Sequence, residues 1–178
     1  MTILKLFTER LCLVPLSLWH FDTFYGFASD ENINYMVHYP MKDRAQVHEF
    51  LVESVNAWHA VNPKELSFAV TRIEDNIIFC IGVVTLYFDN NDTVDDGCIE
   101  LGWLLAPVYR GQGLMTEAVA SVMNWARCEF KPFCFVASCD VRNVSSRRLC
   151  ERLNMRYVKE RYCHERDEVV YATLVKNV

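Results

Sequence analysis

The sequence lacks the features of several specialised protein classes. No apolar run approaches the ~20 residues that a membrane-spanning helix requires. The first ten residues, which include Lys5, Glu9 and Arg10, contain no signal-peptide core. Internal repeats, low-complexity tracts and linkers are also missing. These absences argue against a membrane or secreted protein, and they predict one cytoplasmic domain over residues 1–178.

The sequence also has no excess of basic residues. The 18 lysine and arginine residues are outnumbered by 23 acidic residues, which gives a formal net charge of −5. This balance argues against a nucleic acid bound through a basic face and favours an amine or cationic partner. His38, His48, His59 and His164 are too far apart in the sequence for a metal-ligand spacing, so we expect no metal site.

The eight cysteines form no C-x-x-C pair and follow no regular spacing. Cys80 and Cys134 lie inside the apolar runs 79–81 and 133–135, where a thiol behaves as a small buried hydrophobe. Disulfides are rare in cytosolic proteins. We therefore expect all the cysteines to be reduced.

The composition that remains is that of an ordinary globular protein, because 52% of the residues are apolar and can form a sizeable core. Ser17 and Asp43 are placed as N-caps of two helices, and a third helix starts at Leu114 and ends before Pro132. The expected strands are 11–16, 66–71, 77–88, 98–105, 133–141, 157–163 and 168–175, the last two joined near 165–167, and a short helix spans 145–153. The order β-α-α-β-β-β-α-β-α-β-β predicts an α+β domain with a mixed, mostly antiparallel central sheet and helices on both faces.

The stretch YRGQGLMTEA, residues 109–118, lies between a predicted strand and a predicted helix. Anions bind at such junctions because the first N–H groups of a helix have no partner, and glycine lets the backbone approach a diphosphate. A Walker loop would need a lysine directly after its second glycine, and a dinucleotide fingerprint would need glycine in place of Thr116. Two interpretations of the stretch remain: it is another kind of phosphate-binding loop, or it is a glycine turn that only caps the helix.

Residues 110–115 of this stretch, RGQGLM, resemble a known family signature. The signature is the Q/R-x-x-G-x-G/A motif of the GNAT superfamily of acetyl-CoA-dependent N-acetyltransferases, with Met115 in place of the last small residue. Further matches resemble the RimJ/RimL-like subgroup of ribosomal-protein N-terminal acetyltransferases. They are Thr8-Glu9-Arg10-Leu11 with Pro15-Leu16, Cys98-Ile99-Glu100-Leu101-Gly102-Trp103, Thr116-Glu117-Ala118 and Asn143-Val144-Ser145-Ser146. The resemblance covers nearly the whole chain and implies a single GNAT-like domain.

This resemblance implies acetyl-CoA as the cosubstrate, bound where the strands 98–105 and 133–141 splay apart. Main-chain groups of Trp103, Leu104 and Leu105 would bond the pantetheine arm, and Asn143 would orient its end. The pyrophosphate would be bound by the glycine loop and the start of the helix that follows. This set consists of Arg110, Gly111, Gln112, Gly113, Leu114 and Met115.

Transfer of acetyl to an amine requires a base, because a primary amine is mostly protonated near neutral pH. Glu100 is the candidate, since its place in the apolar run 98–105 predicts partial burial; the alternative is a solvated or salt-bridged glutamate at the end of a strand. Many GNAT enzymes use a tyrosine as the acid, and Cys150 occupies that position here. We expect Ser146 or a water to protonate the leaving thiolate instead, with helix capping by Asn143 and Ser146 as the alternative.

The segment 34–40 joins the first two helices, where the superfamily places acceptor-site residues. Tyr35, His38 and Tyr39 are the candidates for substrate binding, and core packing is the alternative. The expected function is transfer of acetyl to a protein N-terminal α-amine, a polyamine or another small amine, by direct attack in a ternary complex. Homodimers are common in this family. The alternative from another class is a non-catalytic acyl-CoA-binding or regulatory module, which the missing tyrosine would allow.

Overall fold

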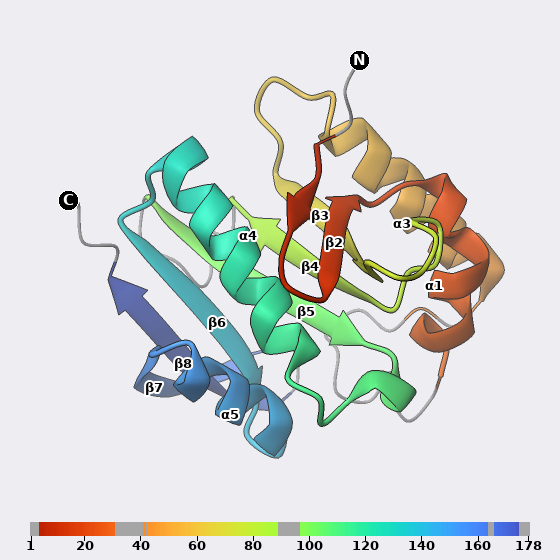
Figure 1. Cartoon of the computed structure of the whole chain (residues 1–178). Helices are drawn as coiled ribbons and strands as arrows, with labels where there is room; N and C mark the ends of the chain where they lie inside the picture. The colour runs from red at the N-terminus through yellow and green to blue at the C-terminus, as the bar shows by residue number, and fades with distance from the viewer. Residues whose placement is uncertain (1–3, 31–40, 42, 89–96, 164–165, 175–178) are drawn as a thin grey trace.

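The computed structural model describes residues 4–30, 41, 43–88, 97–163 and 166–174. They contain one eight-stranded sheet with the strand order β1-β2-β3-β4-β5-β6-β8-β7 (Figure 1). The strands are β1 (Leu6–Phe7), β2 (Leu11–Pro15), β3 (Glu65–Arg72), β4 (Gly82–Tyr87), β5 (Cys98–Leu105), β6 (Cys134–Asp140), β7 (Arg156–Cys163) and β8 (Arg166–Leu174). Neighbouring strands are antiparallel except β5 and β6, which are parallel. The predicted α+β class with a mixed, mostly antiparallel sheet is confirmed.

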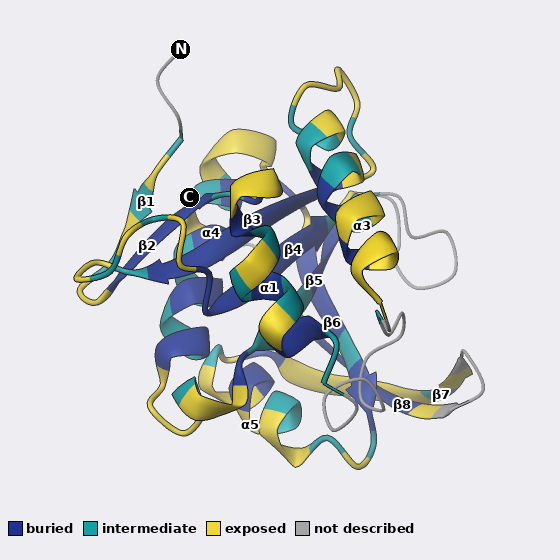
Figure 2. Ribbon diagram, turned by 90° about the vertical axis from the view of Figure 1, so that its right-hand side faces the viewer, coloured by how far each residue is buried: buried dark blue, intermediate teal, exposed yellow. Residues whose placement is uncertain are grey.

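Helices cover both faces of this sheet, so that its central strands are buried (Figure 2). The helical elements are η1 (Leu18–His20), α1 (Phe21–Ala28), α3 (Arg44–Ala57), η2 (Pro107–Tyr109), α4 (Leu114–Phe130) and α5 (Val144–Arg152). On one face Val122 of α4 and Leu149 of α5 pack with Ile99 of β5. On the other face Phe24 of α1 and Leu51 of α3 belong to a second core. None of the helices in the described part of the chain is long and apolar enough to cross a membrane.

Most of the predicted helix boundaries follow from local chemistry, but Ser17 precedes the short helix η1, and α1 itself begins only at Phe21. The Asp43 side chain accepts a hydrogen bond from the Gln46 backbone N–H at 2.9 Å, as expected for the N-cap of α3. Asn143 accepts from the Ser146 backbone N–H at 3.1 Å and caps α5 in the same way. At the C-terminal end of α4, Lys131 takes the left-handed backbone conformation, with φ 49°, and ends the helix.

Three details of the predicted strands are wrong. The two-residue strand β1 is absent from the predicted strands, because it is too short to produce an alternating pattern of apolar and polar residues. β4 begins at Gly82 instead of residue 77, because the Asn76 carbonyl accepts from the Phe79 N–H at 2.8 Å and its side chain accepts from the Ile78 N–H at 3.1 Å. These bonds turn the segment before it can pair. β8 begins at Arg166, so the predicted link at 165–167 falls partly inside that strand.

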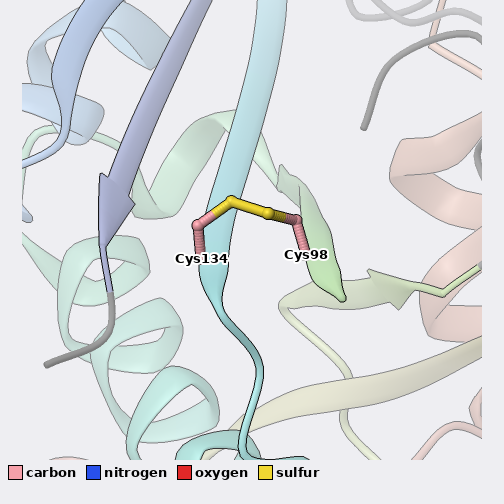
Figure 3. Close-up of a disulfide and its surroundings, with 2 residues drawn as sticks. All are labelled: Cys98 and Cys134. Carbon is pink, nitrogen blue, oxygen red and sulfur yellow. A yellow bond between two sulfur atoms is a disulfide. The ribbon is translucent and has the colours of Figure 1, made fainter. Parts of the chain in front are cut away.

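The expectation that all the cysteines are reduced is also wrong. Cys98 and Cys134 form a disulfide between β5 and β6 (Figure 3). The parallel register places the two residues opposite each other, with their Cα atoms 4.6 Å apart. They are 36 positions apart in the sequence, so their spacing could not reveal the pairing. The other cysteines whose side chains are described are free thiols: Cys12, Cys80, Cys128, Cys139 and Cys150.

Candidate active site

The site is organised around the divergence of the two parallel strands. β5 and β6 pair at only three positions, of which Glu100 with Val136 is the last in the described chain. Beyond it β5 continues to Leu105, paired on its other edge with β4, and β6 continues to Asp140, paired on its other edge with β8. The two facing edges therefore carry main-chain N–H and C=O groups that can bond an extended ligand.

The glycine loop lies between η2 and α4. Gly111 and Gly113 both have left-handed backbone conformations, with φ 77° and 76°, which side chains other than glycine rarely adopt. Gly113 is the N-cap residue of α4, so the loop leads directly to the first N–H groups of that helix. A Cβ atom added to Gly111 would meet no other atom within 4 Å, which shows that the backbone is open to close approach there.

Residues of the turn between β1 and β2 brace this loop, and sequence reasoning missed their contact. Arg10 Nε donates to Glu117 of α4 at 2.7 Å, and the Thr8 hydroxyl donates to the same carboxylate at 2.5 Å. A second guanidinium nitrogen of Arg10 donates to the Gln112 carbonyl at 3.0 Å. Burial alone would raise the pKa of Glu117, but the bonds from Thr8 and Arg10 outweigh it and leave the pKa below its usual value. Both segments were visible as motifs, but nothing in the sequence paired them.

A hollow of about 580 Å³ adjoins the loop, between the start of α4 and the end of α5. Its lining residues are Gly111, Gly113, Thr116, Glu117, Ala120, Arg152 and Leu153. Arg152 was also missed, because it is the last residue of α5 and no motif links it to the loop. Two predicted phosphate contacts, Arg110 and Gln112, bond to backbone carbonyls nearby: Arg110 Nε to Leu105 at 3.2 Å and Gln112 Nε2 to Val108 at 3.4 Å. Both residues are exposed.

Glu100 is the last residue of β5 that pairs with β6, and it is 6% exposed. A solvated glutamate, one of the alternatives, is therefore excluded. The Ser138 hydroxyl donates a hydrogen bond to its carboxylate from β6. Arg161 of β7 donates to the Ser138 oxygen at 2.9 Å and forms an ion pair with Glu168 of β8 at 2.9 Å.

The start of α5 faces β5 across the divergence. The Trp103 indole N–H donates to the Ser146 hydroxyl oxygen at 3.3 Å, so the structure brings two predicted site residues together. Asn143 acts as a helix cap, in line with the alternative considered for it. Cys150, at the usual tyrosine position, is fully buried in the core. Burial raises the pKa of its thiol to about 12, so the thiol stays neutral.

Tyr87 is a further residue that sequence reasoning missed. It pairs with Glu100 in the β4–β5 ladder, and cross-strand partners point to the same face of a sheet. Its ring leans over Gly102: a Cβ atom added there would lie 2.9 Å from the Tyr87 Cε2 atom and 3.4 Å from its hydroxyl oxygen. The predicted substrate residues Tyr35, His38 and Tyr39 lie outside the described residues. Among the residues that are described, no group of three histidine, cysteine or acidic side chains could hold a metal ion.

A sheet that opens between two parallel strands, beside a glycine turn at a helix start, is suited to a protein that binds an extended ligand with an anionic group. The family model described as an acetyltransferase (GNAT) domain matches residues 10–156. The chain belongs to this family and is an acetyl-CoA-dependent acetyltransferase. The open backbone at Gly111 and the unpaired edge of β5 fit that cosubstrate.

The chain is also similar to individual proteins, one in sequence and two in fold. The uncharacterized N-acetyltransferase YnaD of Bacillus subtilis (strain 168) is 25% identical over 149 residues, which is 84% of this chain and 81% of YnaD. The fold is similar to that of RimL, the ribosomal L7/L12 alpha-N-protein acetyltransferase, with a TM-score of 0.81, 13% identity, and coverage of 98% of this chain and 96% of RimL. It is also similar to the microcin C7 self-immunity acetyltransferase MccE in complex with acetyl-CoA and AMP, with a TM-score of 0.77, 17% identity and 94% of each chain covered.

Proposed function

We propose that this enzyme transfers acetyl to the nitrogen of a primary amine, with Glu100 as the general base. The observation that carries the proposal is the position of Glu100, a buried carboxylate where β5 and β6 begin to diverge. Acetyl-CoA supplies a thioester whose carbonyl carbon bonds to the amine nitrogen while the carbon–sulfur bond breaks. A base must take a proton from the amine, since an ammonium nitrogen has no electron pair to donate.

The chain's own groups would hold the cosubstrate along the strand edge and the loop. Those main-chain groups of Trp103, Leu104 and Leu105 that do not bond to β4 would bond the pantetheine arm as an added strand. The amides of residues 111–115 would receive the pyrophosphate, at the positive end of α4. The exposed guanidinium group of Arg110 adds charge beside them, and Arg152 does so from the hollow.

Ser146 is the proposed proton donor to the leaving thiolate. Its oxygen accepts the Trp103 indole N–H, and a hydroxyl has only one hydrogen of its own. That hydrogen is therefore directed away from the indole and can be donated to a ligand between β5 and α5. Asn143 supports this arrangement through its bond to the Ser146 backbone N–H.

The acceptor would approach from the face that Glu100 and Tyr87 share. Three classes of primary amine suit a carboxylate base: the α-amine of a peptide, a polyamine and a smaller amine. Tyr35, His38 and Tyr39 belong to the connection between α1 and α3, and we retain them as proposed substrate-binding residues. A protein N-terminus is the acceptor named for RimL, which makes peptides the first class to test.

A steady-state assay of CoA release over a panel of these amines tests the proposal. We expect amine-dependent release by the wild-type enzyme, and a loss on the order of a hundredfold or more in Glu100→Gln near neutral pH, with acetyl-CoA affinity nearly intact. The residual rate should recover as the pH rises and more amine is unprotonated. Glu160→Gln, which changes an exposed glutamate of β7, is the matched control and should retain full turnover.

Two results would overturn the proposal. Turnover of Glu100→Gln at the wild-type level across the pH range would assign Glu100 a purely structural role. Tight acetyl-CoA binding by the wild-type protein without turnover on any amine would identify a non-catalytic module instead.

A further inference from the structure

Four polar side chains from four strands form a connected network across the sheet. Glu100 of β5 accepts from Ser138 of β6, Ser138 accepts from Arg161 of β7, and Arg161 forms an ion pair with Glu168 of β8. The side chain of Arg161 is 13% exposed and that of Glu168 is fully buried. The network therefore holds three ionisable groups in positions that water reaches poorly, which is costly unless each is held by a partner.

The donor and acceptor in each hydrogen bond of this network can be assigned, because a guanidinium group can only donate hydrogen bonds. One Arg161 N–H occupies the Ser138 oxygen at 2.9 Å, and another is held by Glu168 at 2.9 Å. The hydroxyl hydrogen of Ser138 is thereby left to point to the Glu100 carboxylate, which accepts it. Glu168 fixes Arg161, Arg161 fixes the rotation of the Ser138 hydroxyl, and that hydroxyl fixes one oxygen of Glu100.

The place of this network in the sheet also favours a role at the site. The strands β6, β8 and β7 are joined by long antiparallel ladders, interrupted only by a register shift between Tyr157 and Lys159 of β7, so they need no side-chain bridge to stay together. The bond from Ser138 to Glu100 instead crosses from β6 to β5 two residues beyond Val136, where the ladder between these strands stops. It holds the carboxylate at the edge of the opening.

We infer that Ser138 and Arg161 are positioning residues for the general base, an inference that rests on the function proposed for Glu100. Ser138 holds the carboxylate in one orientation toward the acceptor amine, and Arg161 acts one step further away by aligning Ser138. Neither residue contacts the reacting atoms. Both act on the rate of proton removal and leave the binding of acetyl-CoA unchanged.

The test compares Ser138→Ala with Ser138→Thr, which keeps the hydroxyl. We expect kcat to fall on the order of tenfold in Ser138→Ala, with the KM for acetyl-CoA within about twofold of wild type, because a misplaced base slows the chemical step. Ser138→Thr should recover most of the rate. Ser67→Ala is the matched control, since it removes a bonded serine hydroxyl elsewhere in the same sheet, 2.8 Å from the Thr85 hydroxyl, and should leave kcat unchanged.

A double variant shows whether Ser138 acts through Glu100. In Glu100→Gln the base is already lost, so adding Ser138→Ala should lower the residual rate by less than about twofold. An equal loss in both backgrounds would overturn the inference, and so would full turnover in Ser138→Ala when Glu100→Gln is impaired. Wild-type turnover in Glu100→Gln would overturn the proposed function itself, and the positioning role with it.

Arg161 needs a conservative change, because its removal would leave the buried Glu168 without its cation. Arg161→Lys keeps the charge beside Glu168 but has no planar fork to reach two partners at once. We expect an intermediate loss of kcat that also disappears in the Glu100→Gln background. A loss that persists there, or no loss at all, would remove Arg161 from the positioning network.

Discussion

At the scale of single residues, Gly113 combines two demands. Its backbone is left-handed, with φ 76°, and it supplies the N-cap of α4 where an anion would approach. Asp tolerates the left-handed region better than most side chains, so Gly113→Asp should fold. Its carboxylate would nevertheless occupy the proposed pyrophosphate position and repel that group.

We therefore expect Gly113→Asp to lose most of the rise in Tm that CoA gives the wild-type protein, since a ligand stabilises only in proportion to its binding. Differential scanning fluorimetry with and without CoA measures this. Gly97→Asp is the matched control, because Gly97 is also exposed and left-handed, with φ 87°, and lies at the start of β5 away from the loop. An undiminished shift in Gly113→Asp would move the phosphate site elsewhere.

Cys150 and Ser146 are both on α5 but have different surroundings. Cys150 is fully buried and its thiol is neutral, with a pKa of about 12, so Cys150→Ala should cost about 1 kcal/mol of stability and leave turnover within a few-fold. Ser146→Ala should instead lower kcat with little effect on CoA binding. Urea unfolding and steady-state kinetics separate the two effects. A large loss of turnover in Cys150→Ala alone would make the thiol the proton donor.

At the scale of elements, the brace between the β1–β2 turn and α4 should make stability depend on pH. The folded pKa of Glu117 lies below its ordinary value of 4.5, so the unfolded state binds the proton more tightly. The stabilisation is fully present above the unfolded pKa and is lost as the pH falls through the folded pKa. The difference in Tm between wild type and Glu117→Gln should thus be constant near neutral pH and shrink in acid. A difference that grows below pH 4.5 would contradict the brace.

The sequence could predict where individual elements begin and end, but it could not predict which elements contact one another. Asp43 and Leu114 mark helix starts through local chemistry, and the bounds of β5 follow from its own apolar run. The contacts of Cys98 with Cys134, of Arg10 with Glu117 and of Tyr87 with Gly102 depend on which elements lie side by side. Local patterns do not contain that information. The proposed base could therefore be selected from the sequence, whereas the network that holds it could not.

At the scale of the whole molecule, the disulfide ties β5 to β6 across the intervening α4. Cross-linking residues 36 positions apart restricts the unfolded chain and should stabilise the fold by roughly 3 to 5 kcal/mol. Urea unfolding with and without dithiothreitol measures this contribution. The double variant Cys98→Ala/Cys134→Ala is the control and should not respond to the reductant. An equal response in wild type and double variant would show that the bond does not form in solution.

The single parallel strand pair, β5 and β6, divides the sheet into two groups of strands. Strands β1 to β5 form one antiparallel group and strands β6, β8 and β7 form another, and in the described chain the ladder between the two groups has three residue pairs, with one disulfide and the Ser138–Glu100 bond beside it. The three ladder pairs lie at one end of β5, so the opening between the strands extends from there toward Leu105 and Asp140. An extended ligand can therefore bond to both strands in this opening without displacing any ladder hydrogen bond within either group.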